Sequence, residues 1–497
     1  MTVTETQPET QTADATPCVS DLTRSVIEQV VSLEEYGEAR QRAADGLSKV
    51  VRRVLEKNTT PASAVAEIQE QIAELNQQIE AHLNAVLHHP EFQKLESAWR
   101  GLEHMVKNTP NRNNIHVRVL PVSKKELAKS LRRYEGDWQQ SPLFKLVYAG
   151  IDQPNNTPYA CIIGGYEFDH SKPDVDMLLQ LSKTAAACHA PFIAAASPRL
   201  LGIERWGQVN DPPDLTSLMN SDADKASWRS LREKDDAKYL ALATNRPMAR
   251  PPYGEHNPVD GMDGFTEHVE GTDASKFVWM NPAYAIGANI NKAFDRYGWC
   301  IKIRDNEAGR VEGLPVYTFK DEYGAQALTC PTEVEIGNML AQEMNSLGLV
   351  ALQHHKGTDF GVFQALPSIQ KPAEYDDPDT RADAKLAAKL QYILGLSRFA
   401  HSLNRMATSW RGQFATGKQL EQRLARWVGR YILANPDAPG MGEEAKAARP
   451  LRDAKIAIEA IEGEPGFYSA EISLLPHYQL EGLKASLRLQ SRIRDKQ

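Results

Sequence analysis

The chain has 497 residues, of which 41% are hydrophobic and 25% are charged, and its formal net charge at pH 7 is -8. This composition predicts a folded protein of two or three domains and excludes collagen-like, disulfide-framework and largely disordered chains. The acidic balance disfavours a nucleic-acid partner. The sequence lacks a signal peptide and any apolar run of about 18 residues, so we expect a bacterial cytoplasmic protein without membrane insertion.

The N-terminal 60 residues divide into two parts. Residues 1–17 are polar and acidic, which predicts a disordered tail. Residues 18–60 are predicted to form an N-terminal helical segment. Within it, apolar residues recur every three or four positions, as one face of an amphipathic helix requires. These residues are Leu22, Val26, Ile27 and Val30.

A central α/β domain is predicted over residues 61–375. Thr60-Pro61 is typical of a helix start, and the helix that follows carries a heptad-like apolar seam. That seam comprises Val65, Ile68, Ile72, Leu75, Ile79 and Leu83. It predicts lengthwise packing on another helix, either in an assembly or in a helical hairpin of the same chain.

Strand-like and helix-like patterns then alternate, which is typical of α/β architecture. Helices are predicted at 175–189 and 332–348, and the region 204–275 is expected to form long connecting loops. The predicted strands are IHVRVLPV at 115, YACIIGG at 159, PFIAAAS at 191, WCIKIR at 299 and LPVYTF at 314.

A C-terminal domain of helices and strands is predicted over residues 376–497. Asp377-Pro378 is typical of a helix start, and a three-to-four repeat then runs from Leu386 to Trp410, followed by a second helix from Leu420 to Tyr431. After residue 442 the apolar period changes to two, which predicts three strands with one buried face. Their apolar residues are Ala454, Ile456, Ile458 and Ala460, then Tyr468, Ala470, Ile472 and Leu474, then Leu483, Ala485, Leu487 and Leu489.

The chemical motifs do not support catalysis. GQFATGKQ at 412–419 has phosphate-loop spacing, but Gln419 replaces the magnesium-binding hydroxyl and a helix precedes it. The pairs His88-His89 and His354-His355 lack further ligands, and the five cysteines contain no CxxC pair. We therefore predict no catalytic, cofactor-binding or metal-binding residues. The alternative function from these residues is a soluble α/β enzyme using Glu167, Asp169 and His170.

Several long segments, in order, resemble the TssC/VipB family, the large subunit of the type VI secretion contractile sheath. They are LHHPEFQKLESAWRGLEHMV at 87, HAPFIAAASP at 189, YGWCIKIRDNEAGRVEGLPVYTF at 297, LGLVALQHHKGTDF at 347, LQYILGLSRFAHSLNRM at 390 and EPGFYSAEISLLPHYQLEGLKASLRL at 464. The first 60 residues match only in character, and TNRPMARPPYG at 244–254 departs from the family's pattern.

The resemblance implies a structural, phage-tail-like protein. A TssB/VipA-type small subunit and further copies of the chain would join it in a helical tube, around an inner tube of Hcp-type hexamers. Contraction would propel that tube from a baseplate, and a ClpV-type AAA+ ATPase would recycle the sheath. The sheath of another contractile injection machine remains a further alternative.

Two assembly sites follow from the resemblance together with the residue patterns. The strands joined by residues 474–482 would leave an open edge, which invites strand addition. In this family neighbouring subunits exchange strands through this region, whereas a hairpin completed within its own domain is the alternative. The helix with Leu22, Val26, Ile27 and Val30 is a candidate docking peptide for the ATPase, with a plain structural helix as its alternative.

Overall fold

The computed structural model describes residues 45–46, 48–49, 61–110, 114–152, 157–210, 215–221, 223–260, 264–269, 273–320, 326–355, 357–409, 417–433, 435, 442–460, 467–477 and 487–494. The chain splits into two compact units. The first comprises Met1–His88 and Tyr253–Glu267, and the second comprises His89–Pro252 and His268–Gln497. The predicted tail, 1–17, lies outside the described residues.

The described part of the first unit contains a long helix, α3 (Pro61–Leu87), which begins at the proline that the sequence indicates. Near its end the Asn84 amide donates to the backbone oxygen of Thr266 over 3.2 Å. The His88 imidazole lies 3.4 Å from the Glu267 carboxylate. These contacts hold the last turn of α3 against the segment 264–267.

The second unit is built on a six-stranded sheet in the order β1-β2-β3-β7-β8-β4. Strands β1, β2, β3 and β7 are parallel, and β8 and β4 extend the sheet in antiparallel pairing. The bounds are β1 Ile162–Phe168, β2 Phe192–Ala196, β3 Leu240–Thr244, β7 Leu349–His354, β8 Gly361–Phe363 and β4 Arg310–Val311. A separate hairpin pairs β5 (Thr318–Lys320) with β6 (Gln326–Leu328).

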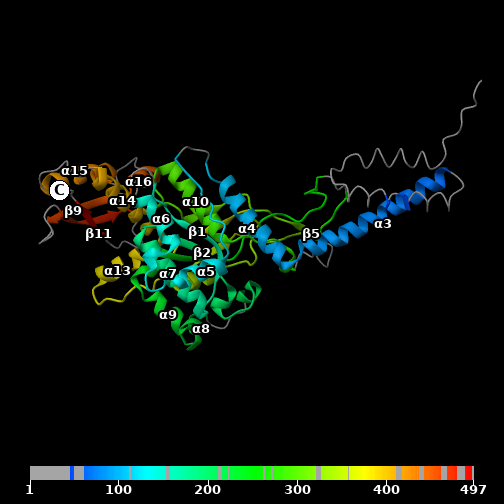
Figure 1. Cartoon of the computed structure of the whole chain (residues 1–497), viewed down its shortest axis with the longest axis horizontal. Coiled ribbons are helices and arrows are strands. Elements are labelled where there is room, and N and C mark those ends of the chain that lie inside the picture. The colour runs from blue at the N-terminus through cyan, green and yellow to red at the C-terminus, as the bar shows by residue number, and fades with distance from the viewer. Residues whose placement is uncertain are drawn as a thin grey trace, which may run out of the picture. The chain divides into compact units, whose positions relative to one another are not determined.

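Both faces of β2, β3 and β7 are buried, which explains their nearly continuous apolar sequence. In β3, Leu240 and Leu242 pack into one core while Ala241 and Ala243 pack into another. Helix α7 (Lys172–Ala187) contributes to the first core and α10 (Pro282–Tyr297) to the second, so they cover opposite faces of the sheet (Figure 1). The other helices of this region are α4 Pro90–Lys107, α5 Lys124–Arg133, α6 Pro142–Asp152, α8 Leu215–Ser221, α9 Ala226–Arg232, α11 Asp305–Ala308 and α12 Asn338–Ser346.

Local sequence sets the ends of these helices. Helix α10 starts at Pro282 behind Asn281, whose side chain accepts the Ala283 N–H at 2.9 Å, and it stops at Gly298 with a φ of 76°. Helix α5 has a capping box between Ser123 and Glu126. Short 3₁₀ turns join the longer elements, namely η1 Trp138–Gln140, η2 Pro198–Leu201, η3 Trp206–Asn210, η4 Ala223–Lys225, η5 Asp235–Tyr239, η6 Ala274–Lys276 and η7 Gly429–Tyr431.

The C-terminal part of the second unit packs helices on a three-stranded antiparallel sheet in the order β11-β10-β9. Its core includes Phe399, Leu424 and Ile472, and Trp299 stacks on Phe399 with ring centroids 4.3 Å apart. The elements are α13 Pro378–Ala387, α14 Leu390–Ser409, α15 Gly417–Val428, α16 Glu443–Ala448, β9 Leu451–Ala460, β10 Phe467–Pro476 and β11 Leu487–Arg494.

The mixed α/β architecture with a C-terminal helix-plus-strand region confirms the predicted fold class. Several element predictions were wrong. The segments 115–122 and 299–304 are not strands, and the supposed loop region 204–275 contains the central strand β3. The predicted helix from Leu386 to Trp410 breaks between α13 and α14, because backbone groups at 388 and 390 bond to residues 368 and 366. The domain boundaries 17, 60 and 375 stay predictions.

Candidate functional site

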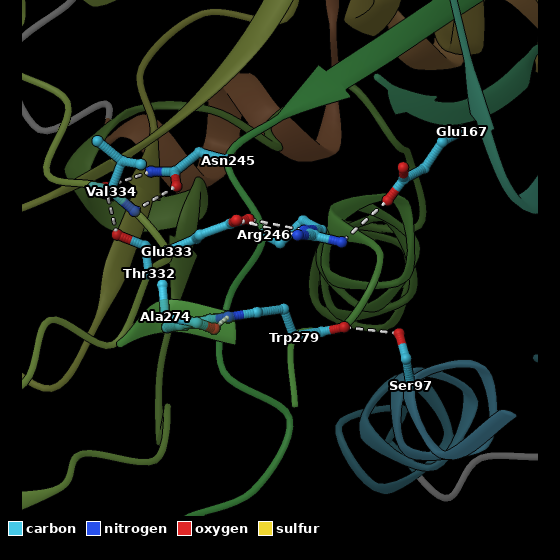
Figure 2. Close-up of polar contacts among 9 residues, drawn as sticks. All are labelled: Ser97, Glu167, Asn245, Arg246, Ala274, Trp279, Thr332, Glu333 and Val334. Atoms are coloured by element: carbon cyan, nitrogen blue, oxygen red, sulfur yellow. Dashed lines mark hydrogen bonds and ion pairs between the residues drawn. The ribbon is translucent and has the colours of Figure 1, made fainter. Parts of the chain in front are cut away.

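A polar network lies where the parallel strands end, and Figure 2 shows its side chains. We call it the sheet-edge network, formed by Glu167, Asn245, Arg246, Thr332, Glu333 and Val334. Asn245 and Arg246 directly follow β3, and Glu167 belongs to β1. Its one signal in the sequence is the polar pair Asn-Arg after the apolar run LALAT, in the segment that departs from the resembled family.

Asn245 is fully buried and has a left-handed backbone, with a φ of 66°. Its amide donates to the backbone oxygens of Val334 and Leu352, both at 2.8 Å. Its side-chain oxygen accepts the Val334 N–H at 3.1 Å. Asparagine suits this position because it tolerates a positive φ and supplies both donors and an acceptor. Asn245 thereby fastens the ends of β3 and β7 to the segment 332–334.

Arg246 joins two carboxylates of this network. Its guanidinium donates to Glu333 over 2.7 and 2.9 Å and to Glu167 over 3.3 Å. Burial lowers the pKa of Arg246, but the contacts with Glu333 and Glu167 outweigh it and leave the pKa above its ordinary value. A fork-shaped pair of this kind fixes geometry as well as charge. The arrangement is a clamp between strand ends.

The three residues considered for acid-base chemistry, Glu167, Asp169 and His170, have separate surroundings in the structure. Glu167 is held by Arg246 as a counter-ion. Asp169 accepts the Ser171 N–H at 2.8 Å, which forms the turn before α7. The Nδ1 atom of His170 is buried without a hydrogen bond among the described residues. Two of the three side chains therefore serve the local structure, and no shared reaction centre joins them.

Figure 2 also shows how α4 is tied to the same region. The Ser97 hydroxyl donates to the Trp279 backbone oxygen at 2.6 Å, and the Trp279 indole donates to the Ala274 oxygen at 2.7 Å. Farther along, Arg250 pairs with Glu96 at 2.6 Å. These contacts fix the helix that carries the most specific family-like segment.

The remaining chemical motifs also have structural positions. Lys418 lies in the first turn of α15, and the described element before it is helix α14, not a strand. His89 caps α4, whereas His354 bonds to Cys330 and His355 packs near Phe360. Within the described residues no group of three or more His, Cys, Asp or Glu side chains could hold a metal ion.

Six of the eight predicted strand-exchange residues lie in the C-terminal sheet. Tyr468, Ala470, Ile472 and Leu474 lie in β10, the middle strand, where Ile472 and Leu474 are buried. In β11, Leu487 pairs with Leu474 and Leu489 with Ile472. Leu483 and Ala485 lie outside the described residues.

The two outer strands of this sheet differ in their free edges. Strand β9 has a bridge from Ile432 to Leu451, and the Leu433 N–H donates to the Leu451 oxygen at 2.8 Å. Strand β11 ends the sheet order, and no described strand pairs with its outer edge. An edge of this kind exposes main-chain donors and acceptors to a further strand.

Two helices expose apolar faces. In the first unit, the α3 seam is open, with Ile68, Ile72, Leu75 and Ile79 between 42% and 51% exposed. In the second unit, α4 buries Gly101 and Met105 but leaves Leu95, Trp99 and Val106 between 50% and 63% exposed. Exposed large apolar groups in rows mark contact surfaces.

Two further expectations concern the N-terminal docking helix and the absence of membrane-spanning helices. The candidate docking helix with Leu22, Val26, Ile27 and Val30 lies outside them. Among the helices that are described, none is both long and apolar enough to cross a bilayer.

Comparison with known proteins gives consistent matches along the chain. Residues 69–370 match the profile described as VipB: EvpB/VC_A0108, tail sheath N-terminal domain, and residues 379–493 match VipB_2: EvpB/VC_A0108, tail sheath gpW/gp25-like domain. The chain is 42% identical over 470 residues to a type VI secretion system sheath protein TssC1 of Pseudomonas aeruginosa, covering 93% of this chain and 94% of that protein.

Two solved structures are more distant. The baseplate of the anti-feeding prophage is matched at 10% identity with a TM-score of 0.32, over 77% of this chain and 80% of that one. The sheath tail protein Lin1278 from Listeria innocua is matched at 9% identity with a TM-score of 0.25, over 64% of this chain and 60% of that one.

Proposed function

This chain belongs to the TssC/VipB family of large type VI secretion sheath subunits, and from that premise we propose that it co-polymerises with a small sheath subunit into a contractile helical tube. It is a structural sheath protein and not an enzyme. The observation that carries the proposal is the combination of two sheath profiles, covering residues 69–370 and 379–493, with a C-terminal sheet in which no described strand pairs with the outer edge of β11.

Strand exchange through β10 and β11 is the assembly contact we favour. The buried side chains Ile472 and Leu474 anchor β10 to α14 and α15 through a shared core. The backbone of β11 lies at the sheet margin, so it can bond to β10 on one side and to a neighbouring subunit's strand on the other. Side chains and main chain can thus serve different partners.

A pair of substitutions at Leu487 tests this contact in the chain co-expressed with its small subunit. Leu487→Pro removes a backbone donor and fixes φ, whereas Leu487→Ala keeps the donor and loses only side-chain packing. We expect the proline variant to bind the small subunit without forming tubules in negative-stain micrographs. The alanine variant should form tubules at reduced yield. Normal tubules from the proline variant would contradict strand exchange.

The further partners follow from the same family membership. We propose an Hcp-type inner tube inside the sheath, a baseplate at its end and a ClpV-type AAA+ ATPase that recycles it, all in the bacterial cytoplasm. The face of α15 with exposed Lys418, Arg423 and Arg426 is suited to an acidic surface such as a tube wall could present. Docking of the ATPase on the helix around Leu22 and Val26 stays a prediction.

A further inference from the structure

Cys330 lies against a histidine at the margin of the sheet-edge network. Its sulfur is 3.4 Å from Nδ1 of His354, a residue at the end of β7. The Cys330 sulfur is also 3.2 Å from the Thr332 hydroxyl oxygen. Cys330 and His354 are each partly exposed, so solvent and small solutes can approach the pair.

The hydrogen bonds fix the protonation pattern of this pair. His354 Nε2 lies 2.8 Å from the Thr358 backbone oxygen, which can only accept, so Nε2 carries a hydrogen. In the neutral ring, Nδ1 is then an acceptor aimed at the Cys330 sulfur. The Thr332 hydroxyl donates its hydrogen to the Val334 oxygen at 2.9 Å, so it does not compete for Nδ1.

We propose that Cys330 is a covalent modification site, a thiol that His354 deprotonates for attack on small uncharged electrophiles such as hydrogen peroxide. A nucleophile and a base within hydrogen-bond reach, with the base oriented by a third group, form the arrangement that activates thiols elsewhere. The proposal does not rest on the assembly contacts proposed above, since none of these residues belongs to β10, β11 or α15.

The electrostatics of the pair support the geometry. Burial raises the pKa of the Cys330 thiol, but hydrogen bonds with His354 and with Thr332 outweigh it and leave the pKa below its ordinary value. Burial lowers the pKa of His354, but Cys330, the Thr358 oxygen and the charge of Glu335 outweigh it and leave the pKa raised. Both shifts lower the cost of moving the proton from the Cys330 sulfur to the His354 imidazole.

The other described cysteines differ in this respect. Burial raises the pKa of Cys161 and Cys188 to about 12 and that of Cys300 to about 11. Of the four described cysteines, Cys330 is the one whose sulfur contacts an imidazole. The remaining three therefore provide internal controls for reactivity.

The reaction with peroxide is balanced by the pair itself. The Cys330 thiolate attacks one peroxide oxygen, an S–O bond forms and the O–O bond breaks. The departing hydroxide takes the proton from the His354 imidazolium and leaves as water, so the sum is thiol plus hydrogen peroxide giving sulfenic acid plus water. Sulfur is oxidised, peroxide is reduced, and an added thiol can reverse the step.

Alkylation followed by peptide mass spectrometry tests the proposal on the full chain assembled with its small subunit. Iodoacetamide at limiting concentration should label Cys330 at least about tenfold faster than Cys161, Cys188 and Cys300 at pH 7, because each pKa unit changes the thiolate fraction tenfold. Peroxide pretreatment should block the labelling of Cys330, and dithiothreitol should restore it.

Two variants separate an activating role of His354 from a structural one. His354→Gln should slow the labelling of Cys330 at least about threefold and move its pH-rate midpoint upward, whereas a merely loosened site would label faster. His355→Gln, at the adjacent position, should leave the rate unchanged. Equal labelling of all four cysteines, or a rate in His354→Gln that is unchanged or faster, would overturn the proposal.

Discussion

At the scale of single residues, Asn245 shows how one side chain can hold several strands. It makes three hydrogen bonds from a buried position with a left-handed backbone. Each bond contributes about 1 kcal/mol net, and alanine at this position would remove all three. Replacing Asn245 should therefore change the free energy of unfolding of the chain and not its contacts with other subunits.

We expect Asn245→Ala to lower the free energy of unfolding by about 3 kcal/mol, measured by urea denaturation. Asn245→Gly loses the same bonds but accepts a positive φ without strain, so its loss should be smaller by about 1 kcal/mol. An alanine variant within about 0.5 kcal/mol of the original chain would show that the three bonds contribute little.

The buried position of His401 leads us to predict that the chain loses stability when the pH is lowered. His401 is buried, and burial lowers its pKa from the ordinary 6.5 to about 4, although its bond to the Cys188 oxygen at 2.9 Å acts in the opposite direction. The unfolded chain then takes up a proton near pH 6.5, before the folded chain does. Stability is fully present above that pH and is lost as the pH falls toward 4.

The chain should lose about 2 kcal/mol through His401 between pH 7 and pH 5, since one pKa unit corresponds to about 1.4 kcal/mol. Urea unfolding at both pH values measures this loss. His401→Gln can keep a donor for the Cys188 oxygen but has no titrating group, so its loss over the same interval should be smaller by that amount. An identical pH dependence in both chains would disprove the assignment.

At the scale of elements, the approach of α4 to α10 depends on a glycine. A Cβ added at Gly101 would overlap the Tyr284 ring, so the two helices approach more closely than a side chain would allow. Although alanine favours a helix by about 1 kcal/mol over glycine, overpacking of a fitted interface costs about 1 to 3 kcal/mol. The cost of overpacking against Tyr284 should therefore exceed the gain in helix propensity.

Gly101→Ala should therefore reduce the free energy of unfolding by about 1 kcal/mol or more, as measured by urea denaturation. Gly207→Ala is the matched control, because nothing lies within 4 Å of a Cβ at that position. Its stability should stay within about 0.5 kcal/mol of the original chain. A more stable Gly101→Ala chain would mean that α4 can move away from α10.

The elements differ in how well the sequence predicts them, and the reason is physical. Strands β1 and β2 follow from short apolar runs, and α14 follows from its periodic apolar residues. By contrast, the segment 115–122 alternates like a strand but has no described partner, with Val117, Val119 and Leu120 exposed. Alternation indicates extended backbone, while a strand also needs a partner that the local sequence does not reveal.

The segment 299–304 and the strand β3 show the same limit. Trp299 packs in the C-terminal core while Cys300 and Ile303 pack beside the central sheet, so the apolar residues serve two cores without strand pairing. Strand β3 was missed because the surrounding region is rich in proline, glycine and aspartate. The sheet-edge network was equally hidden, since Glu167, Arg246 and Glu333 meet only through long-range pairing.

At the scale of the whole molecule, an exposed and a buried tryptophan allow the contacts used in assembly to be tested separately from those that stabilise the fold. Trp99 is 63% exposed on α4, between exposed Leu95 and Val106, whereas Trp228 is fully buried. A large exposed aromatic residue in an apolar row is typical of an interface hot spot. In a sheath subunit, a neighbouring subunit can cover such a row, which explains why it is exposed in the single chain.

Trp99→Ala should change the free energy of unfolding of the subunit by less than about 0.5 kcal/mol. It should nevertheless reduce tubule formation in cells that co-express the chain and its small subunit. Trp228→Ala should lower the free energy of unfolding by about 3 to 5 kcal/mol. Urea denaturation and negative-stain microscopy of both variants give the comparison. Normal tubule yield from Trp99→Ala would remove this face from the assembly contacts.

The burial of the central sheet on both faces has a mechanical consequence. Close-packed interiors resist gradual deformation, so the interior that contains Ala241, Leu242 and Val350 cannot act as a compliant spring. Shortening of a polymer made from such subunits has to occur as rotation and sliding of stiff bodies, with compliance confined to the joints between them. The work delivered in one stroke is then limited by the difference in joint free energy between the long and short lattices, multiplied by the number of subunits.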